Sequence, residues 1–237
     1  MWFDSGMTAV VDTLPPGAAG DPLATADYAT FAARLRASGC RRCALAAART
    51  NIVVDRGDPA AGIVAVGEGP GEQEDLAGRA FVGRAGRLLD ELLQAVGLDP
   101  ERHLLIANVV KCRPPANRVP HADEVAACMP YLRRQIELVR PHTVLLLGAT
   151  AHRHFVHAQK SFAMEREVGR RFSLDAWPGI SFYTLYHPAY LLRSPGRKPL
   201  ALGHLAQVRE QIEAQGRWPA QPPDGDPAMA PPRRPVV

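Results

Sequence analysis

Apolar residues fall into two kinds of segment along the chain. Four short runs are almost continuously apolar and too short for long helices, namely 62–68 (GIVAVGE), 103–110 (HLLIANVV), 143–149 (TVLLLGA) and 181–187 (SFYTLYH). Such runs are typical of strands buried on both faces. Around them, apolar residues recur at helical spacing within 28–35, 88–96, 125–139 and 205–212. Continuous apolar strands separated by helices predict an α/β fold with a four-stranded, mostly parallel sheet covered on both faces.

The two ends of the chain show neither pattern. Residues 11–22 are rich in proline, glycine and alanine, and seven of the 22 prolines lie in 219–237. Neither composition can bury a core. We therefore predict a disordered N-terminal segment (1–24), one folded domain (25–218) and a disordered proline-rich tail (219–237). A solvated tail is the favoured interpretation, and weak binding of a protein partner through its prolines is the alternative.

Composition narrows the class of protein. None of the apolar runs in the 237 residues approaches the ~20 residues that a membrane helix needs. The start of the chain also lacks the basic and then apolar segments of a secretory signal. We expect a monomeric, cytoplasmic protein with no membrane partner, associated with the nucleoid if it binds DNA. The net charge of +4 permits a nucleic-acid partner without requiring one.

All four cysteines of the chain are candidates for one site. Cys40 and Cys43 form a C-x-x-C pair, whereas Cys112 and Cys128 lie far downstream. In a reducing compartment such cysteines are metal ligands or ordinary core residues. A tetrahedral zinc ion and an iron–sulfur cluster both take four cysteines, and the wide second spacing favours a cluster. The alternative is a redox pair at Cys40 and Cys43 with Cys128 in the core, and spacing does not decide between them.

The predicted strand ends carry most of the polar chemistry. In open parallel sheets, ligands bind at the carboxyl ends of the strands. The first strand is followed by GEGPGEQED (67–75), whose glycines let a ligand approach the backbone or simply form a tight turn. Asn108 lies in an apolar strand, where its amide needs a partner from the backbone or from a ligand. His187 ends the fourth strand and faces the same edge, and Phe81 is a stacking platform or a core side chain.

Six motifs in order along 26–215 carry a family resemblance. They are CRRCAL (40–45), GEGPGEQED (67–75), AFVGRAGRLLD (80–90), ANVVKCRPPANR (107–118), EVAAC (124–128) and HPAYLLRSP (187–195). Together they resemble the family 4 uracil-DNA glycosylases, the iron–sulfur members of that superfamily. The resemblance implies a three-layer α/β/α sandwich around the four-stranded sheet. It also implies a 4Fe–4S cluster held by Cys40, Cys43, Cys112 and Cys128.

The resemblance further implies a DNA-repair enzyme that flips uracil out of DNA and hydrolyses its N-glycosidic bond. It is then a monofunctional glycosylase that leaves an abasic site. Phe81 would stack on the uracil. Asn108 would accept a hydrogen bond from N3–H and donate one to O4, which rejects cytosine. His187 would donate to O2 as charge develops on the departing base.

One position departs from the pattern of related glycosylases. The residue that handles the attacking water in those enzymes corresponds to Gly69, which has no side chain. We therefore expect a neighbouring carboxylate to replace it, Glu74 as the first choice and Glu68 as the alternative. Backbone groups of Gly69, Pro70 and Gly71 would line the uracil. The departure also keeps open a second function, a non-catalytic module that binds uracil-containing or damaged DNA and carries a structural cluster.

Contacts to DNA are expected from two sets of residues. The segment after His187 resembles a loop that wedges into DNA, and it contains Leu191, Leu192 and Arg193. Lys111, Arg113, Arg118 and Arg193 would contact phosphates, although each is also consistent with an ordinary solvated charge. The expected partner is uracil-containing DNA, single- or double-stranded.

Overall fold

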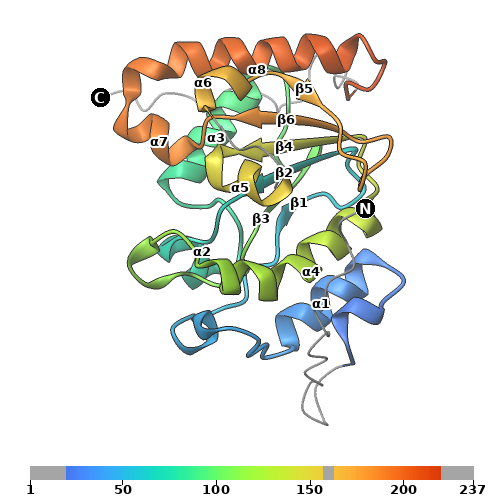
Figure 1. The fold of residues 1–237 in the computed structure, drawn as a ribbon, viewed down its shortest axis with the longest axis vertical. Helices are drawn as coiled ribbons and strands as arrows, with labels where there is room; N and C mark the ends of the chain where they lie inside the picture. The colour runs from blue at the N-terminus through green and yellow to red at the C-terminus, as the bar shows by residue number, and fades with distance from the viewer. Residues whose placement is uncertain (1–19, 157–162, 220–237) are drawn as a thin grey trace, which may run out of the picture.

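One six-stranded sheet forms the centre of the molecule (Figure 1). The computed structural model describes residues 20–156 and 163–219. The strands lie in the order β1-β3-β2-β4-β6-β5. Their bounds are β1 Arg56–Gly57, β2 Ile63–Gly67, β3 Leu104–Asn108, β4 Thr143–Leu147, β5 Arg171–Phe172 and β6 Ser181–Leu185.

The four predicted strands form the parallel centre of this sheet. β2 pairs in parallel with β3 and with β4, and β4 pairs in parallel with β6. The predicted strand number was wrong, because β1 and β5 add an antiparallel pairing at each edge. Both are two residues long. A strand of that length leaves no apolar run by which the sequence could reveal it.

Each central strand is buried along its whole length, because helices cover both faces of the sheet. Val64 and Val66 of β2 belong to one hydrophobic cluster, and Ile63 and Ala65 belong to the other. This alternation follows from successive strand side chains pointing to opposite faces. It also explains why these strands read as continuous apolar runs instead of alternating ones.

Two pairs of long helices complete the layers. One cluster joins the sheet to α1 (Tyr28–Ala37) and α4 (Ala122–Val139), and the other joins it to α3 (Arg84–Ala95) and α8 (Lys198–Glu213). Figure 1 shows α1 and α4 at one end of the view and α8 at the other, with the strands between them. The arrangement is helix, sheet, helix, as expected for a three-layer α/β/α sandwich.

Short helices fill the connections between these layers. They are η1 (Pro22–Ala24), η2 (Ala44–Ala47), α2 (Glu72–Ala77), η3 (Pro115–Asn117), α5 (Gly148–Phe155), α6 (Met164–Glu167), α7 (Pro188–Arg193) and η4 (Pro195–Arg197). No helix in the described part of the chain is both long and apolar enough to cross a membrane.

The predicted domain boundaries lie only partly within the described residues. Residues 1–19 of the predicted N-terminal segment and 220–237 of the predicted tail lie outside the described residues. The described chain already forms η1 before the predicted start of the domain at residue 25.

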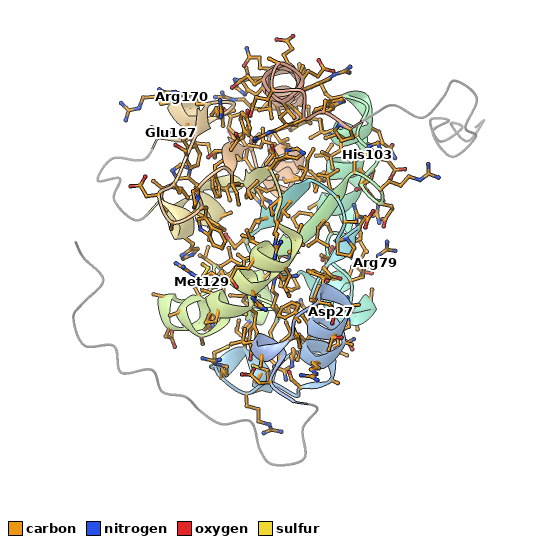
Figure 2. All side chains as sticks on the ribbon, turned by 90° about the vertical axis from the view of Figure 1, so that its right-hand side faces the viewer. Asp27, Arg79, His103, Met129, Glu167 and Arg170 are labelled. Atoms are coloured by element: carbon orange, nitrogen blue, oxygen red, sulfur yellow. The ribbon has the colours of Figure 1, made fainter. Side chains whose placement is uncertain are left out.

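Figure 2 shows the side chains that fill the space between the layers, with Arg79 and His103 on one flank and Glu167 and Arg170 on the other.

Candidate active site and cysteine site

A cavity of about 620 Å³ opens at the carboxyl ends of the parallel strands. Its walls come from the loop after β2, the loop before α3, the end of β3, the segment around η3, and α7. The predicted site residues that line it are Glu68, Gly69, Pro70, Gly71, Glu74, Phe81, Asn108, Arg118, His187, Leu192 and Arg193. Parallel pairing brings these distant segments together, because all the central strands end at the same edge.

Asn108 presents an unsatisfied amide oxygen to this cavity. It is the last residue of β3, pairs in register with Gly67 of β2, and is 1% exposed. Its Oδ1 is buried and has no hydrogen-bond partner among the described residues. An unsatisfied buried acceptor costs about 1–3 kcal/mol. Such a group in a cavity wall is suited to a ligand that donates a hydrogen bond.

Phe81 forms the neighbouring wall in a strained backbone conformation. Its φ is 52°, in the left-handed region, which costs a residue other than glycine about 1–3 kcal/mol. Its ring centroid lies 6.0 Å from that of His187. A Cβ at Gly67 would lie 2.5 Å from Phe81 Cζ and 2.5 Å from Asn108 Oδ1. The absence of a side chain at Gly67 therefore leaves room for both groups.

His187 lies between β6 and α7 as a neutral imidazole. Its Nδ1 accepts a hydrogen bond from the backbone N–H of Ala189 at 3.1 Å, so the ring hydrogen is on Nε2. Burial, together with the positive charge of Arg193, lowers the pKa of His187 to about 4. At neutral pH the side chain is thus an uncharged donor. Gly148 makes room for it, because a Cβ there would lie 2.9 Å from His187 Cβ.

The two candidate carboxylates have different surroundings. Glu74 Oε1 accepts a hydrogen bond from Gly83 N at 2.6 Å, and its Oε2 accepts one from Gly71 N at 3.1 Å. Glu74 therefore ties the loop after β2 to the loop before α3. Glu68 lines the same cavity, and within residues 20–156 and 163–219 no hydrogen bond or ion pair is found for its carboxylate.

Gly69 has no room for a side chain. A Cβ at this position would lie 2.8 Å from Val110 Cγ2 and 3.6 Å from Pro114 Cδ. Val110 N donates a hydrogen bond to Glu68 O at 3.1 Å, which holds the two loops at this separation. A carboxylate at position 69 would require these loops to move apart.

The four cysteines surround a second, much smaller hollow. They come from the segment after α1, the segment after β3, and α4, and none of them forms a disulfide. Three donors point at their sulfurs: Arg49 Nη1 at 3.3 Å from Cys112 Sγ, Lys111 N at 3.3 Å from Cys128 Sγ, and Tyr131 OH at 3.6 Å from Cys40 Sγ. Such donors stabilise sulfurs that carry negative charge.

Burial favours the protonated form of three of these thiols in the absence of a bound cation. It raises the pKa of Cys43 and of Cys112, and it raises that of Cys128 to about 12. Across the described residues, no three histidine, cysteine, aspartate or glutamate side chains are arranged to hold a single metal ion. The hollow therefore combines four thiols and sulfur-directed donors without the geometry of a one-ion site.

Comparison with known proteins identifies the family of the chain. A model of the uracil-DNA glycosylase superfamily matches residues 54–209. The type-4 uracil-DNA glycosylase of Thermotoga maritima is 42% identical over 183 residues, which cover 76% of this chain and 93% of that protein. The chain belongs to the type-4 uracil-DNA glycosylases. The type-4 enzymes of Archaeoglobus fulgidus and Sulfurisphaera tokodaii are each 39% identical, over 74% and 72% of this chain and 83% and 79% of their own lengths.

Two of the predicted DNA contacts of this glycosylase lie in its interior, which corrects those predictions. Lys111 is 1% exposed, and its Nζ donates to Asn108 O at 2.9 Å and to Gln135 Oε1. Leu191 is completely buried, in a cluster with Leu88 and Tyr186. Neither side chain can reach DNA without leaving its partners. The sequence does not show this burial, because it depends on segments distant along the chain, with Gln135 bonded to Lys111 and Leu88 packed against Leu191.

The other predicted DNA contacts lie near the surface, but two are already paired with acids. Arg113 lies 3.4 Å from Glu72, and Arg118 makes two hydrogen bonds with Glu124, at 2.8 and 2.7 Å. Leu192 and Arg193 remain at the rim of the cavity. The pairing reduces the positive charge that Arg113 and Arg118 offer to phosphates.

Several rim residues of the glycosylase were missed by sequence reasoning. Arg84, exposed at the start of α3, Tyr190 of α7, and Val119, which is 59% exposed, all line the cavity. Arg84 adjoins Gly83 in the AFVGR motif, and that was the signal available. Tyr190 likewise lies in the motif HPAYLLRSP (187–195), whereas nothing local in the sequence distinguishes Val119 from ordinary apolar surface.

The buried neutral His187 predicts a pH-dependent stability. Above its ordinary pKa of 6.5 the imidazole is neutral in both folded and unfolded chains. Between pH 6.5 and about 4, only the unfolded chain takes up a proton there, so the free energy of unfolding falls as the pH falls. His187→Gln removes this titration. The free energy of unfolding is measured by urea denaturation at about pH 7.5 and about pH 4.5. It should fall more between these two values in the wild type than in the variant. Equal decreases would contradict a buried, neutral His187.

Proposed function

We propose that this protein removes uracil from DNA by flipping the nucleotide into the cavity and hydrolysing the bond between uracil N1 and the sugar C1′. The observation that carries the proposal is the buried, unpartnered amide oxygen of Asn108 beside the ring of Phe81 and the neutral His187. A glycosidic bond within the base stack is inaccessible, so the base must leave the helix. The products are free uracil and an abasic site.

Recognition of uracil follows from the hydrogen-bond pattern of the Asn108 amide. Its Oδ1 accepts the N3–H of uracil, and its amide N–H donates to O4. Cytosine has an acceptor at N3 and an amino group at C4, so both contacts would become repulsive. Because the amide is buried, such a mismatch leaves polar groups unpaired and the wrong base is rejected. Phe81 supplies the face on which the base stacks.

Departure of the base is assisted by His187. When the bond breaks, its electron pair goes to N1 and the negative charge spreads to O2. The Nε2–H of His187 then donates to O2 more strongly than it does to the neutral base, which lowers the barrier. A neutral donor suits this task because it stabilises the anion while retaining its own proton.

We assign activation of water to Glu68 and a structural role to Glu74, the reverse of the order favoured by sequence. Both oxygens of Glu74 already accept backbone hydrogen bonds, whereas Glu68 lines the cavity and its carboxylate has no hydrogen bond or ion pair among the described residues. Glu68 takes a proton from the water while the water oxygen forms its bond to C1′. No lysine is among the described residues that line the cavity, which supports hydrolysis rather than attack by an amine.

We further propose that Cys40, Cys43, Cys112 and Cys128 hold a 4Fe–4S cluster. Four thiols around one hollow, with N–H and O–H donors aimed at the sulfurs, match the ligand set of such a cluster. When bound, the cluster cross-links the segment after α1 to the segment after β3 and to α4, and its binding contributes to folding.

Uracil excision is the first test. An end-labelled oligonucleotide with one uracil should be cut at that position after incubation and alkali treatment, and the matching thymine oligonucleotide should stay intact. His187→Gln should lower the single-turnover rate by about 10²–10³ with little change in DNA binding. Binding of uracil-containing DNA without cleavage by the wild type would favour the non-catalytic alternative, and no binding at all would contradict both.

The two glutamates should separate chemistry from stability. Glu68→Gln should lower the single-turnover rate by a factor of about 10²–10⁴ and leave the melting temperature unchanged. Glu74→Gln replaces one acceptor by an N–H that faces a backbone N–H, so it should lower the melting temperature by several degrees. A variant Glu68→Gln with wild-type chemistry would exclude Glu68 as the base.

Metal content tests the cysteine site. Protein purified without oxygen should be brown, with iron and acid-labile sulfide in nearly equal amounts. Cys128→Ser should lose the colour, the iron and part of the thermal stability, whereas Ala44→Ser, at an exposed position next to Cys43, should change none of these. Colourless wild-type protein that contains stoichiometric zinc would refute the cluster.

A further inference from the structure

Arg56 is a buried cation on an edge strand of the sheet. It opens the two-residue β1, and its side chain is 4% exposed. Burying a guanidinium is unfavourable unless its N–H groups find partners. Here Nη1 and Nη2 bond to the carboxylate of Asp90 on α3, whereas Nε lies 3.4 Å from Glu101 in an ion pair but has no hydrogen-bond partner among the described residues. Glu101 is itself paired with Arg79, labelled on the flank of Figure 2.

One Arg56 hydrogen bond goes to the active site. Nη1 also donates to the backbone carbonyl oxygen of Phe81, at 2.7 Å. On its other side this carbonyl lies against Gly86, where a Cβ would be 1.8 Å from the oxygen. The carbonyl of the strained residue is therefore fixed between the guanidinium and the first turn of α3. Its direction sets the backbone conformation of Phe81 and hence the position of the ring.

Arg56 also connects the two residues that would contact the base. β1 pairs antiparallel with β3, and Arg56 lies opposite Ile106, two residues before Asn108. On the cavity side, Glu74 holds Gly83 N at 2.6 Å, so the segment from Phe81 to Gly83 is held at both ends. Without Arg56, the carbonyl of Phe81 would lose its charged donor, and that hydrogen bond would no longer offset the strain of the left-handed conformation.

We propose that Arg56, anchored by Asp90, is a positioning residue for uracil excision that acts through Phe81. It touches neither the base nor the water, since it is absent from the cavity wall. Its effect on catalysis is to keep the Phe81 ring where an extruded pyrimidine can stack. The proposal rests on the proposed function, in which Phe81 is the stacking residue.

A double-mutant cycle tests this proposal. Arg56→Met, Phe81→Ala and the double variant are compared by single-turnover excision from a uracil oligonucleotide, at a temperature where all are folded. Arg56→Met should lower the single-turnover rate about tenfold, since small displacements of a positioning group are costly. In the Phe81→Ala background, the same substitution should have little further effect, because the residue through which it acts is gone. Inhibition by free uracil should weaken in parallel.

Arg209→Met is the matched control. Arg209 also pairs with a carboxylate, Glu213, and donates to a backbone carbonyl, that of Val96, at 3.2 Å, but Val96, unlike Phe81, does not line the cavity. Arg209→Met should leave excision and uracil inhibition unchanged. Arg56→Lys keeps the charge but cannot contact both Asp90 and Phe81 as a fork, so it should restore activity only in part.

The outcomes are distinct. Wild-type activity in Arg56→Met, or a loss that multiplies with that of Phe81→Ala, would overturn the positioning role. If Arg56→Met does not fold, Asp90→Asn takes its place in the cycle, with a smaller loss that should again vanish beside Phe81→Ala. A wild-type protein that excises no uracil would instead count against the proposed function, and Phe81→Ala with full activity would overturn the role of the ring.

Discussion

The pairing of β2 with β3 is the interaction on which both sites depend. Its register places Gly67 opposite Asn108, so the Asn108 amide lies beside a residue without a side chain. The pairing continues past the strands, because Val109 N donates to Gly67 O at 2.9 Å and Val110 N donates to Glu68 O. The same backbone then delivers Cys112 to the cysteine hollow. A shift of this register by one residue would exchange every side chain between the two faces of the sheet.

Lys111 is the physical link between the two sites. Its side chain bonds to the carbonyl oxygen of Asn108, whereas its backbone N–H bonds to Cys128 Sγ. Gln135 of α4 accepts from its Nζ and donates to the hydroxyl of Tyr28 and to Val54 O. Burial lowers the pKa of Lys111 to about 8. Lys111, which the sequence presents as a surface cation, is thus a buried side chain that joins Asn108 to α4. Order at the cysteines therefore contributes to order at Asn108.

Sequence was sufficient wherever a feature depends on local pattern. The four central strands appear as apolar runs, and Asn108 and His187 stand out because polar groups at strand ends are unusual. Features set by distant contacts were not predictable. The edge strands β1 and β5 are too short to show a pattern, Leu191 is covered by residues such as Leu88 from far upstream, and Glu74 is distinguished from Glu68 only by the backbone N–H groups around it. The buried ion pair of Arg56 with Asp90 likewise joins residues that no motif connects.

The protonation state of His187 follows from the residues that come after it. Pro188 begins α7 and has no N–H, so the first backbone donor available at this helix end is Ala189, which bonds to Nδ1. A second proton on the imidazole would have to be placed at Nδ1, where it would face that N–H. Burial disfavours the charged ring further, and Arg193 on the same short helix repels it. The His-Pro-Ala order therefore keeps the hydrogen on Nε2 and the ring uncharged, which is the state that the proposed donation to uracil O2 requires.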